Sequence, residues 1–239
     1  MNTENLDKEE ILKFDSIASS WWDKEGEFKP LHQINPLRVN YLKEKVELSG
    51  KKILDIGCGG GILAESLREE GSIVTAIDAS EKTINVAKTH AKKIKSDVTY
   101  INSTVEEYIE KGLEGEFDVI TCLEMLEHVP NPPSIIKSCK KLMKPGGHIF
   151  FSTINRNPKS YLFAIIGAEY ILNLLPKGTH EYSKFIKPSE LANWIRRNNL
   201  ELRDTRGMSY NPLTDNYWLG NDMQVNYFMH AMKLNDEEI

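Results

Sequence analysis

The sequence has few cysteines and no pattern that would pair them. Its 239 residues include three, Cys58, Cys122 and Cys139, and no C-x-x-C spacing. An odd number without such spacing excludes a disulfide framework and a zinc site built from thiolates. This usage is typical of a reducing compartment, and we interpret Cys58 as a small loop residue and not as a nucleophile.

Long apolar runs and targeting segments are also lacking. The N-terminus is polar and acidic, without the apolar core of a signal peptide or the arginine-rich pattern of a transit peptide, so we expect a cytoplasmic protein. Residues 161–175 form an apolar stretch that Glu169 and Asn173 interrupt, and it is shorter than the roughly 20 residues needed to span a bilayer.

Basic residues are not in excess. The formal net charge is −5, which argues against nucleic acid as a partner because a surface that follows phosphates is usually basic. Hydrophobic residues make up 40% of the chain, enough for a sizeable core in one large domain or one domain with additions. No internal repeat or low-complexity tract divides it.

A glycine-rich stretch, residues 55–61, is the most informative segment. It reads Asp-Ile-Gly-Cys-Gly-Gly-Gly and lies between a short apolar run and a helical pattern. Glycines in such a turn let a ligand approach the backbone. Asp78 ends the next apolar run, 21 residues after Gly57, where nucleotide-binding α/β folds place a carboxylate for ribose hydroxyls. The spacing fits neither G-x-G-x-x-G nor a P-loop, so we predict a nucleoside site of another kind.

Strand and helix patterns alternate through the middle of the chain, which predicts a parallel, doubly wound α/β sheet. We expect strands at 51–56, 72–78, 98–102, 117–122, 147–153, 200–207 and 225–233, and helices at 60–70, 80–95, 104–111, 133–143 and 188–198. Two further helices are expected before the first strand, one from Glu9 to Trp22 and one from Asn35-Pro36 to about Leu48.

Glu124, Glu127 and His128 follow the fourth strand. If a helical turn begins there, the three side chains share one face. Two carboxylates and an imidazole can bind a divalent cation, with oxygen-rich sites suiting Mg²⁺ or Mn²⁺, or they can supply a general base. Both alternatives stay open at this stage.

The motif D-x-G-x-G-x-G at 55–61, together with Asp78, resembles motif I and the ribose-binding acid of class I S-adenosylmethionine-dependent methyltransferases. The block at 14–38, with Trp21-Trp22 at its centre, is similar to a narrower family, the ubiquinone biosynthesis O-methyltransferases. That similarity continues through 55–65, 122–130, 151–157, 167–172, 176–180, 184–188 and 210–212.

The resemblance implies a Rossmann-like, seven-stranded, mostly parallel sheet with helices on both faces and an antiparallel last strand. It implies S-adenosylmethionine as cofactor, and as reaction the O-methylation of ring hydroxyls in polyprenylated catechols or quinols. The two steps are 3-demethylubiquinol to ubiquinol and 2-polyprenyl-6-hydroxyphenol to its methoxy product. By position the residues implied to bind the cofactor are Arg38, Gly57, Gly59, Gly61, Asp78 and Leu123. Those implied to bind a metal, such as Mg²⁺, are Glu124, Glu127 and His128, with His128 and Glu127 also the catalytic candidates.

We expect residues 1–239 to form one methyltransferase domain. Residues 1–50 would be a helical cap over cofactor and substrate, and residues 155–187 an apolar lid. Residues 160–175 would contact a membrane surface or pack in the core, and the former would place the protein at the inner face of a membrane. Partners would be the polyprenylated acceptor and, by extension, other proteins of the pathway.

Two alternatives remain from sequence alone. One is a different small-molecule methyltransferase, and the other is a non-catalytic protein that holds S-adenosylmethionine within a pathway complex. A panel of acceptors separates the first from the main interpretation, and turnover separates the second.

Overall fold

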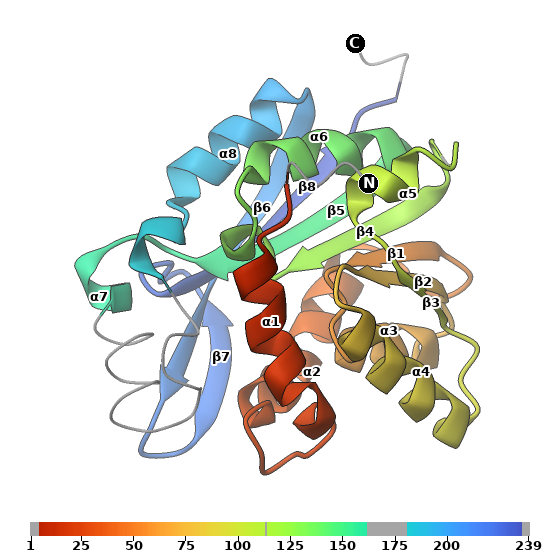
Figure 1. Ribbon diagram of the computed structural model, residues 1–239. Helices are drawn as coiled ribbons and strands as arrows, with labels where there is room; N and C mark the ends of the chain where they lie inside the picture. The colour runs from red at the N-terminus through yellow and green to blue at the C-terminus, as the bar shows by residue number, and fades with distance from the viewer. Residues whose placement is uncertain (1–4, 113, 162–180, 236–239) are drawn as a thin grey trace.

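A computed structural model describes residues 5–112, 114–161 and 181–235 of the chain, built around one mixed sheet of eight strands in the order β3-β2-β1-β4-β5-β8-β6-β7 (Figure 1). The strands are β1 (Lys52–Ile56), β2 (Ile73–Asp78), β3 (Thr99–Asn102), β4 (Phe117–Leu123), β5 (Met143–Ile154), β6 (Leu200–Asn211), β7 (Asn216–Gly220) and β8 (Asn226–Lys233). Strands β1 to β5 run parallel to one another, and β8 is antiparallel to both β5 and β6.

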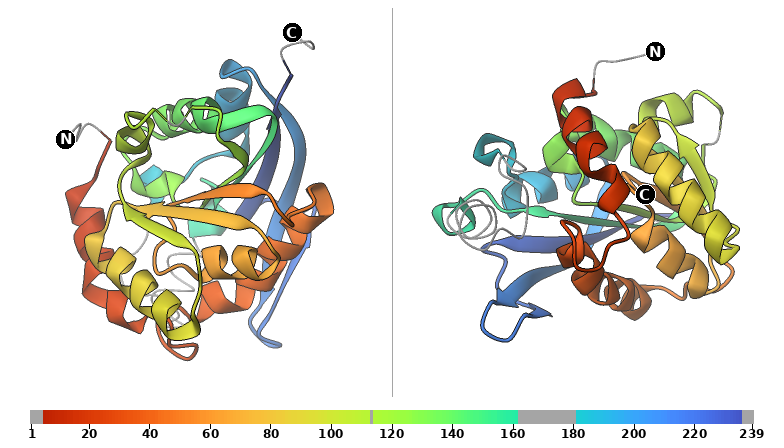
Figure 2. Two further views of the ribbon diagram at one scale, coloured as in Figure 1. Left: turned by 90° about the vertical axis from the view of Figure 1, so that its right-hand side faces the viewer. Right: turned by 60° about the horizontal axis from the view of Figure 1, so that its bottom comes forward.

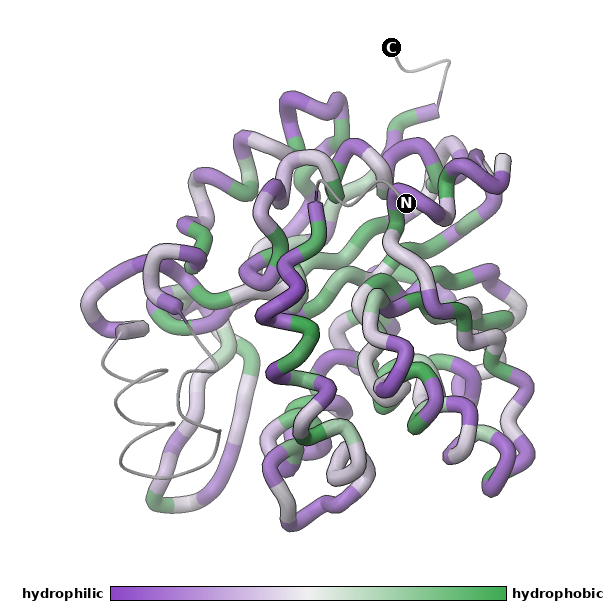
Figure 3. Tube along the Cα trace, viewed as in Figure 1, coloured by the Kyte–Doolittle hydropathy of each residue, from purple (hydrophilic) through white to green (hydrophobic). Residues whose placement is uncertain are grey.

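The central strands are apolar on both faces because helices cover both sides, as Figure 2 shows from two further directions. Alternate residues of each strand enter opposite cores, so that Leu54 and Ile120 pack in one and Ile53 and Val119 in the other. This is the pattern of a parallel sheet with two covered faces. Along the chain trace, apolar colouring concentrates in these strands and polar colouring in the outer helices (Figure 3).

Helices α2, α3 and α4 lie on one face and α5, α6 and α8 on the other (Figure 1). Their bounds are α1 (Lys8–Ile17), α2 (Lys29–Lys45), α3 (Ile62–Glu69), α4 (Glu81–Ile94), α5 (Val105–Ile109), α6 (Pro132–Leu142), α7 (Pro158–Ser160) and α8 (Pro188–Arg197). The short 3₁₀ turns of the described residues are η1 (Ala18–Ser20), η2 (Leu126–His128) and η4 (Tyr182–Lys184). Among the described residues, no helix has the length and apolar character needed to cross a bilayer.

The expected α/β architecture and its antiparallel last strand are confirmed, but the number of strands is eight and not seven. The additional strand, β7, forms a hairpin with the end of β6, where Met208 pairs with Leu219 and Tyr210 with Tyr217. It was missed because it has five residues and lies at the sheet edge, so that burial imposes no clear apolar pattern on it.

Both N-terminal helices differ from the expectation. The first ends at Ile17, because the hydroxyls of Ser16 and Ser20 donate to carbonyls three residues earlier and compete with the helical hydrogen bonds. The second begins at Lys29 with Pro30 in its first turn, and Pro36 lies inside it. A proline removes one backbone donor, and burial of one face of the helix outweighs that loss.

His230 on β8 provides a test of how the sheet is buried. Its side chain is 4% exposed, stacks on Phe150 and bonds to His148 at 2.9 Å. Burial, and then the neighbouring His148, lower its pKa to about 4. Because the folded pKa lies below the unfolded one, this histidine destabilises the fold as the pH falls from its unfolded pKa of about 6.5 to about 4.

We therefore expect the free energy of unfolding of the wild type to fall by about 2 kcal/mol more than that of His230→Met between about pH 7.5 and about pH 5. Urea unfolding at both pH values measures this difference. Equal losses in the two proteins would contradict the buried neutral histidine.

Candidate active site

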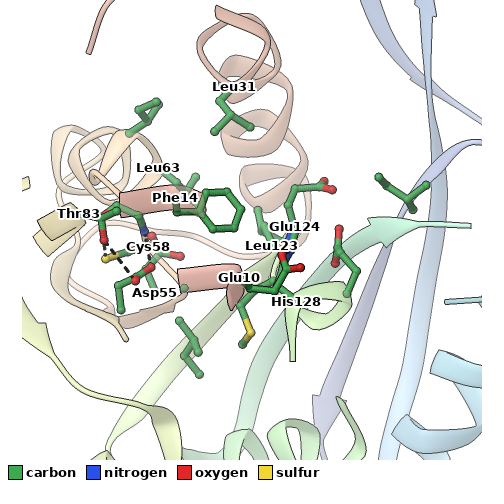
Figure 4. A pocket seen from close by; sticks show the side chains of 18 of the residues that line it. Glu10, Phe14, Leu31, Asp55, Cys58, Leu63, Thr83, Leu123, Glu124 and His128 are labelled. Atoms are coloured by element: carbon green, nitrogen blue, oxygen red, sulfur yellow. Dashed lines mark hydrogen bonds and ion pairs between the residues drawn. The ribbon is translucent and has the colours of Figure 1, made fainter. Parts of the chain in front are cut away.

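The carboxyl ends of the central parallel strands and the N-terminal helices enclose a cavity of about 850 Å³. Figure 4 shows its side chains arriving from α1, from the glycine-rich loop after β1, and from the segment after β4. Nearly all the residues that the sequence singled out line it, namely Arg38, Gly57, Gly59, Asp78, Leu123, Glu124, Glu127 and His128. Gly61 is the exception, since it is the N-cap of α3 and lies against the hydroxyl of Tyr100.

The glycine-rich loop is tightly covered by the N-terminal segment. Gly59 has a φ of +52°, and a Cβ atom there would lie 2.0 Å from the ring of Trp21. The indole N–H of Trp22 donates to the carbonyl of Gly60 at 2.9 Å. The pair Trp21-Trp22 therefore packs directly on the loop, and Gly59 and Gly60 are required for that approach because a Cβ atom at either would clash with Trp21.

Asp78, at the end of β2, links this loop to the start of α4. Its carboxylate accepts hydrogen bonds from the backbone N–H groups of Gly59 at 2.9 Å and Ser80 at 2.8 Å, and from the Thr83 hydroxyl at 3.2 Å. Burial raises the pKa of Asp78, against the effect of these hydrogen bonds. The acid is thus held at the cavity wall in a fixed orientation, next to the loop.

Arg38 of α2 is a buried cation beside several acids. Its side chain approaches Glu124, with Nη2 at 3.6 Å from Oε1, and neither Nε nor Nη2 has a hydrogen-bond partner in the described part of the chain. Burial lowers the pKa of Arg38, while Glu124 and Asp55 act against that shift. A desolvated guanidinium with unsatisfied donors is suited to a carboxylate ligand.

Asp55, the first residue of the glycine motif, is a buried residue of the cavity wall that is 3% exposed. One oxygen accepts from the Thr121 hydroxyl at 2.7 Å, and the other has no partner among the residues described. Burial raises the pKa of Asp55 to about 7, although Thr121 and Arg38 act in the opposite direction. This carboxyl group adds to the local acidity that Arg38 balances.

The expected helical face of Glu124, Glu127 and His128 is wrong. Glu124 directly follows β4 and has a left-handed φ of +52°, and the helical turn η2 begins only at Leu126. With this backbone, the Glu124 carboxylate accepts hydrogen bonds from the Ser152 hydroxyl at 2.7 Å and the Asn226 amide at 3.1 Å. The three side chains consequently do not project together from one helix face.

Glu127 is held by a residue of β5. The Thr153 hydroxyl donates to Oε2 of Glu127 at 2.8 Å. The other oxygen of Glu127, Oε1, has no hydrogen-bond partner in the described residues. Burial, and then the neighbouring Glu124, raise the pKa of Glu127.

Across residues 5–112, 114–161 and 181–235, no three His, Cys, Asp or Glu side chains are grouped so that they could hold a metal ion.

Glu10 is a site residue that sequence reasoning missed. It lies on α1, is 4% exposed, and bonds through Oε2 to Nδ1 of His128 at 2.9 Å (Figure 4). Burial would raise the pKa of Glu10, but hydrogen bonds from His128 and from lysines hold it well below its ordinary value. The only sequence signal was an acidic residue among the apolar positions of that helix.

Comparisons with known proteins agree with this geometry. A family model described as "Methyltransferase domain" matches residues 32–205. Ubiquinone biosynthesis O-methyltransferases from Marinobacter nauticus and Pseudomonas aeruginosa are each 56% identical to this chain. The first match covers 97% of this chain and 98% of the relative, and the second 96% and 98%.

Solved structures support the same fold. A SAM-dependent methyltransferase of Thermotoga maritima, described as a possible histamine N-methyltransferase, superposes with a TM-score of 0.67 at 18% identity, covering 94% of this chain and 99% of that one. Magnesium protoporphyrin IX methyltransferase from Synechocystis, with bound SAH, gives 0.65 at 18% identity and covers 95% and 100%.

Gly59→Ala tests the contact between the loop and the tryptophan. The new methyl group must displace Trp21, and the left-handed backbone adds about 1–2 kcal/mol of strain. We expect about tenfold weaker binding of S-adenosylmethionine, equivalent to about 1.4 kcal/mol, measured by calorimetry.

Gly50→Ala is the matched control. Gly50 has a φ of +73° and nothing within 4 Å of its Cβ position, so this variant carries the backbone strain without the contact. If it weakened binding as much as Gly59→Ala, the close approach of Trp21 would not be the cause.

Proposed function

The chain belongs to the family of ubiquinone biosynthesis O-methyltransferases, and we propose that it transfers the methyl group of S-adenosylmethionine to ring hydroxyls of polyprenylated catechol and quinol intermediates. Those would be 2-polyprenyl-6-hydroxyphenol and 3-demethylubiquinol. The observation that carries the proposal is that the glycine-rich loop, the buried Arg38, His128 and Glu127 line the same cavity. Near-complete coverage of the relatives at 56% identity supports the same acceptor class.

The cofactor fits the donors and acceptors on one side of the cavity. The unsatisfied donors of Arg38 would take its carboxylate, and Asp78 would accept from its ribose hydroxyls. Leu123, which is 7% exposed at the end of β4, would pack against the adenine. Bound there, S-adenosylmethionine supplies a methyl group activated by sulfonium charge.

The protein's part in the chemistry is to position the acceptor ring and remove its proton. A free phenol has a pKa of about 10, so the hydroxyl must lose its proton as the new bond forms. We assign the base to His128, which lines the cavity. The unpartnered Oε1 of Glu127 would bind the neighbouring ring oxygen, since the raised pKa of this carboxyl group favours its protonated, hydrogen-donating form.

A divalent cation is the alternative route to an ionised hydroxyl. It would use the oxygens of Glu124 and Glu127 and a nitrogen of His128. Among the residues that the structure describes, these side chains are not grouped so that they could hold a metal ion, and Ser152, Thr153 and Glu10 each bond to one atom of the three. We therefore derive the proton removal from His128 alone.

Methyl transfer from labelled S-adenosylmethionine to a short-chain 3-demethylubiquinol tests the proposal. Turnover that persists in EDTA supports His128 as the unaided base, whereas turnover that EDTA abolishes and Mg²⁺ restores contradicts it and favours the cation. Binding of the cofactor without any turnover would contradict the acceptor class and favour another acceptor or the non-catalytic alternative.

Arg38→Lys tests the carboxylate contact. Lysine keeps the charge and loses the planar fork of donors, so we expect S-adenosylmethionine to bind about 10-fold to 100-fold more weakly, as for loss of a charge-assisted hydrogen bond. Calorimetric titration measures this loss. Arg68→Lys, at a surface arginine paired with Asp97, should bind like the wild type, and an unchanged affinity in Arg38→Lys would contradict the assignment.

We also propose that residues 1–50 act as a cap and residues 155–187 as a lid, and that residues 160–175 contact the inner face of a membrane to receive the polyprenyl tail. Most of this stretch lies outside the described residues, and the proposal rests on its apolar sequence and its flanking lysines, Lys159 and Lys177.

Flotation with liposomes tests the membrane contact. Ile165→Asp with Ile166→Asp should reduce the fraction that floats while leaving turnover of a short-chain acceptor intact. Ile73→Asp, at an exposed position of β2, is the control for a charge placed elsewhere on the surface. Unchanged flotation of the double variant would contradict the proposal.

A further inference from the structure

One face of α1 contacts the imidazole of His128 in two ways. Glu10 bonds to Nδ1 at 2.9 Å, and the ring of Phe14 packs against the imidazole edge-to-face, with centroids 5.0 Å apart. The two residues are one helical turn apart, so both reach the same ring from α1 (Figure 4).

Glu10 is itself held in place from the opposite side. Its other oxygen, Oε1, is bound by the ammonium groups of Lys13 at 2.9 Å and Lys184 at 3.1 Å. A buried carboxyl group between two cations is ionised, and an ionised carboxylate only accepts hydrogen bonds. The proton of this bond therefore belongs to Nδ1 of His128.

The bond between Glu10 and Nδ1 decides which nitrogen of His128 can accept a proton. With Nδ1–H committed to Glu10, any proton that His128 takes from an acceptor has to arrive at Nε2. A carboxylate that fixes both the tautomer and the orientation of an imidazole makes that nitrogen a better placed base. The same logic holds for histidines that a neighbouring carboxylate orients for other tasks.

We propose that Glu10 is a positioning residue for His128, and that docking of α1 completes the base. The proposal rests on the proposed function insofar as it takes His128 to be the base. Lys184 of η4 also bonds to Asp7, the N-cap of α1, at 2.9 Å. The orientation of the imidazole thus depends on a helix and a turn that are far from it in sequence.

Glu10→Gln tests the proposal, because it keeps the shape of the side chain and removes the charge. We expect kcat for the short-chain acceptor to fall by about 10-fold to 100-fold, as for other carboxylates that orient a histidine, with an unchanged affinity for S-adenosylmethionine. Glu9→Gln is the control, since Glu9 is exposed on the same helix, and it should turn over like the wild type.

A double-mutant cycle separates positioning from simple attachment of the helix. In a His128→Ala background, Glu10→Gln should cause no further loss of kcat, because the group it positions is gone. An equal further loss would overturn the proposal and make Glu10 a structural contact. Lys184→Met, which spares the bond to His128, should cost less activity than Glu10→Gln, and an equal cost would also overturn the proposal.

Nitrogen-15 NMR of histidine-labelled protein provides a readout that does not depend on turnover. His128, assigned by loss of its signals in His128→Asn, should show a proton on Nδ1 in the wild type and lose that preference in Glu10→Gln. A wild-type signal with the proton on Nε2 alone would overturn the proposal. If this preference is found and no acceptor is methylated, the proposed function fails and the positioning stands.

Discussion

One buried guanidinium, that of Arg38, balances the acidic groups that the strands bring together. Asp55 lies near the end of β1, Glu124 follows β4, and Glu127 lies in η2, all near the same cation. Carboxyl groups withdrawn from water in this way are tolerated only with a counter-charge or a bound proton, and removing one partner of such a group leaves the rest uncompensated. The cluster keeps the ends of these strands together, and it leaves unsatisfied guanidinium donors where a carboxylate ligand fits.

The N-terminal segment belongs to the site as much as the sheet does. Trp21 covers the glycine-rich loop and Trp22 bonds to it, while Glu10 and Phe14 contact His128. One continuous piece of chain therefore contacts both the glycine-rich loop and His128. Because one segment makes both contacts, the orientation of the His128 ring depends on the same piece of chain that packs over the loop.

Much of the fold was predictable from local patterns. The parallel strands were expected within a few residues of where they lie, because strands buried on both faces have to be apolar along their length. The start of α2 at Lys29, the strand β7 and the left-handed Glu124 were not predicted. Each depends on packing or on a hydrogen bond to a distant residue, such as Ser152 with Glu124, which leaves no periodic trace in the sequence.

The sequence by itself determined the α/β architecture, the glycine-rich turn after β1 and the acid that ends β2, because glycine placement and apolar periodicity act on the backbone locally. It also singled out Glu127 and His128 by their residue types after the fourth strand, and Arg38 through a resemblance. Only the tertiary structure decided which groups meet. Glu10 and His128 are 118 residues apart in sequence but form a hydrogen bond. Glu124 has a left-handed backbone and lies outside the helical turn in which it was expected. Such partners depend on the order of strands in the sheet and on how the N-terminal helices dock, and these are long-range consequences of burial that no local pattern encodes.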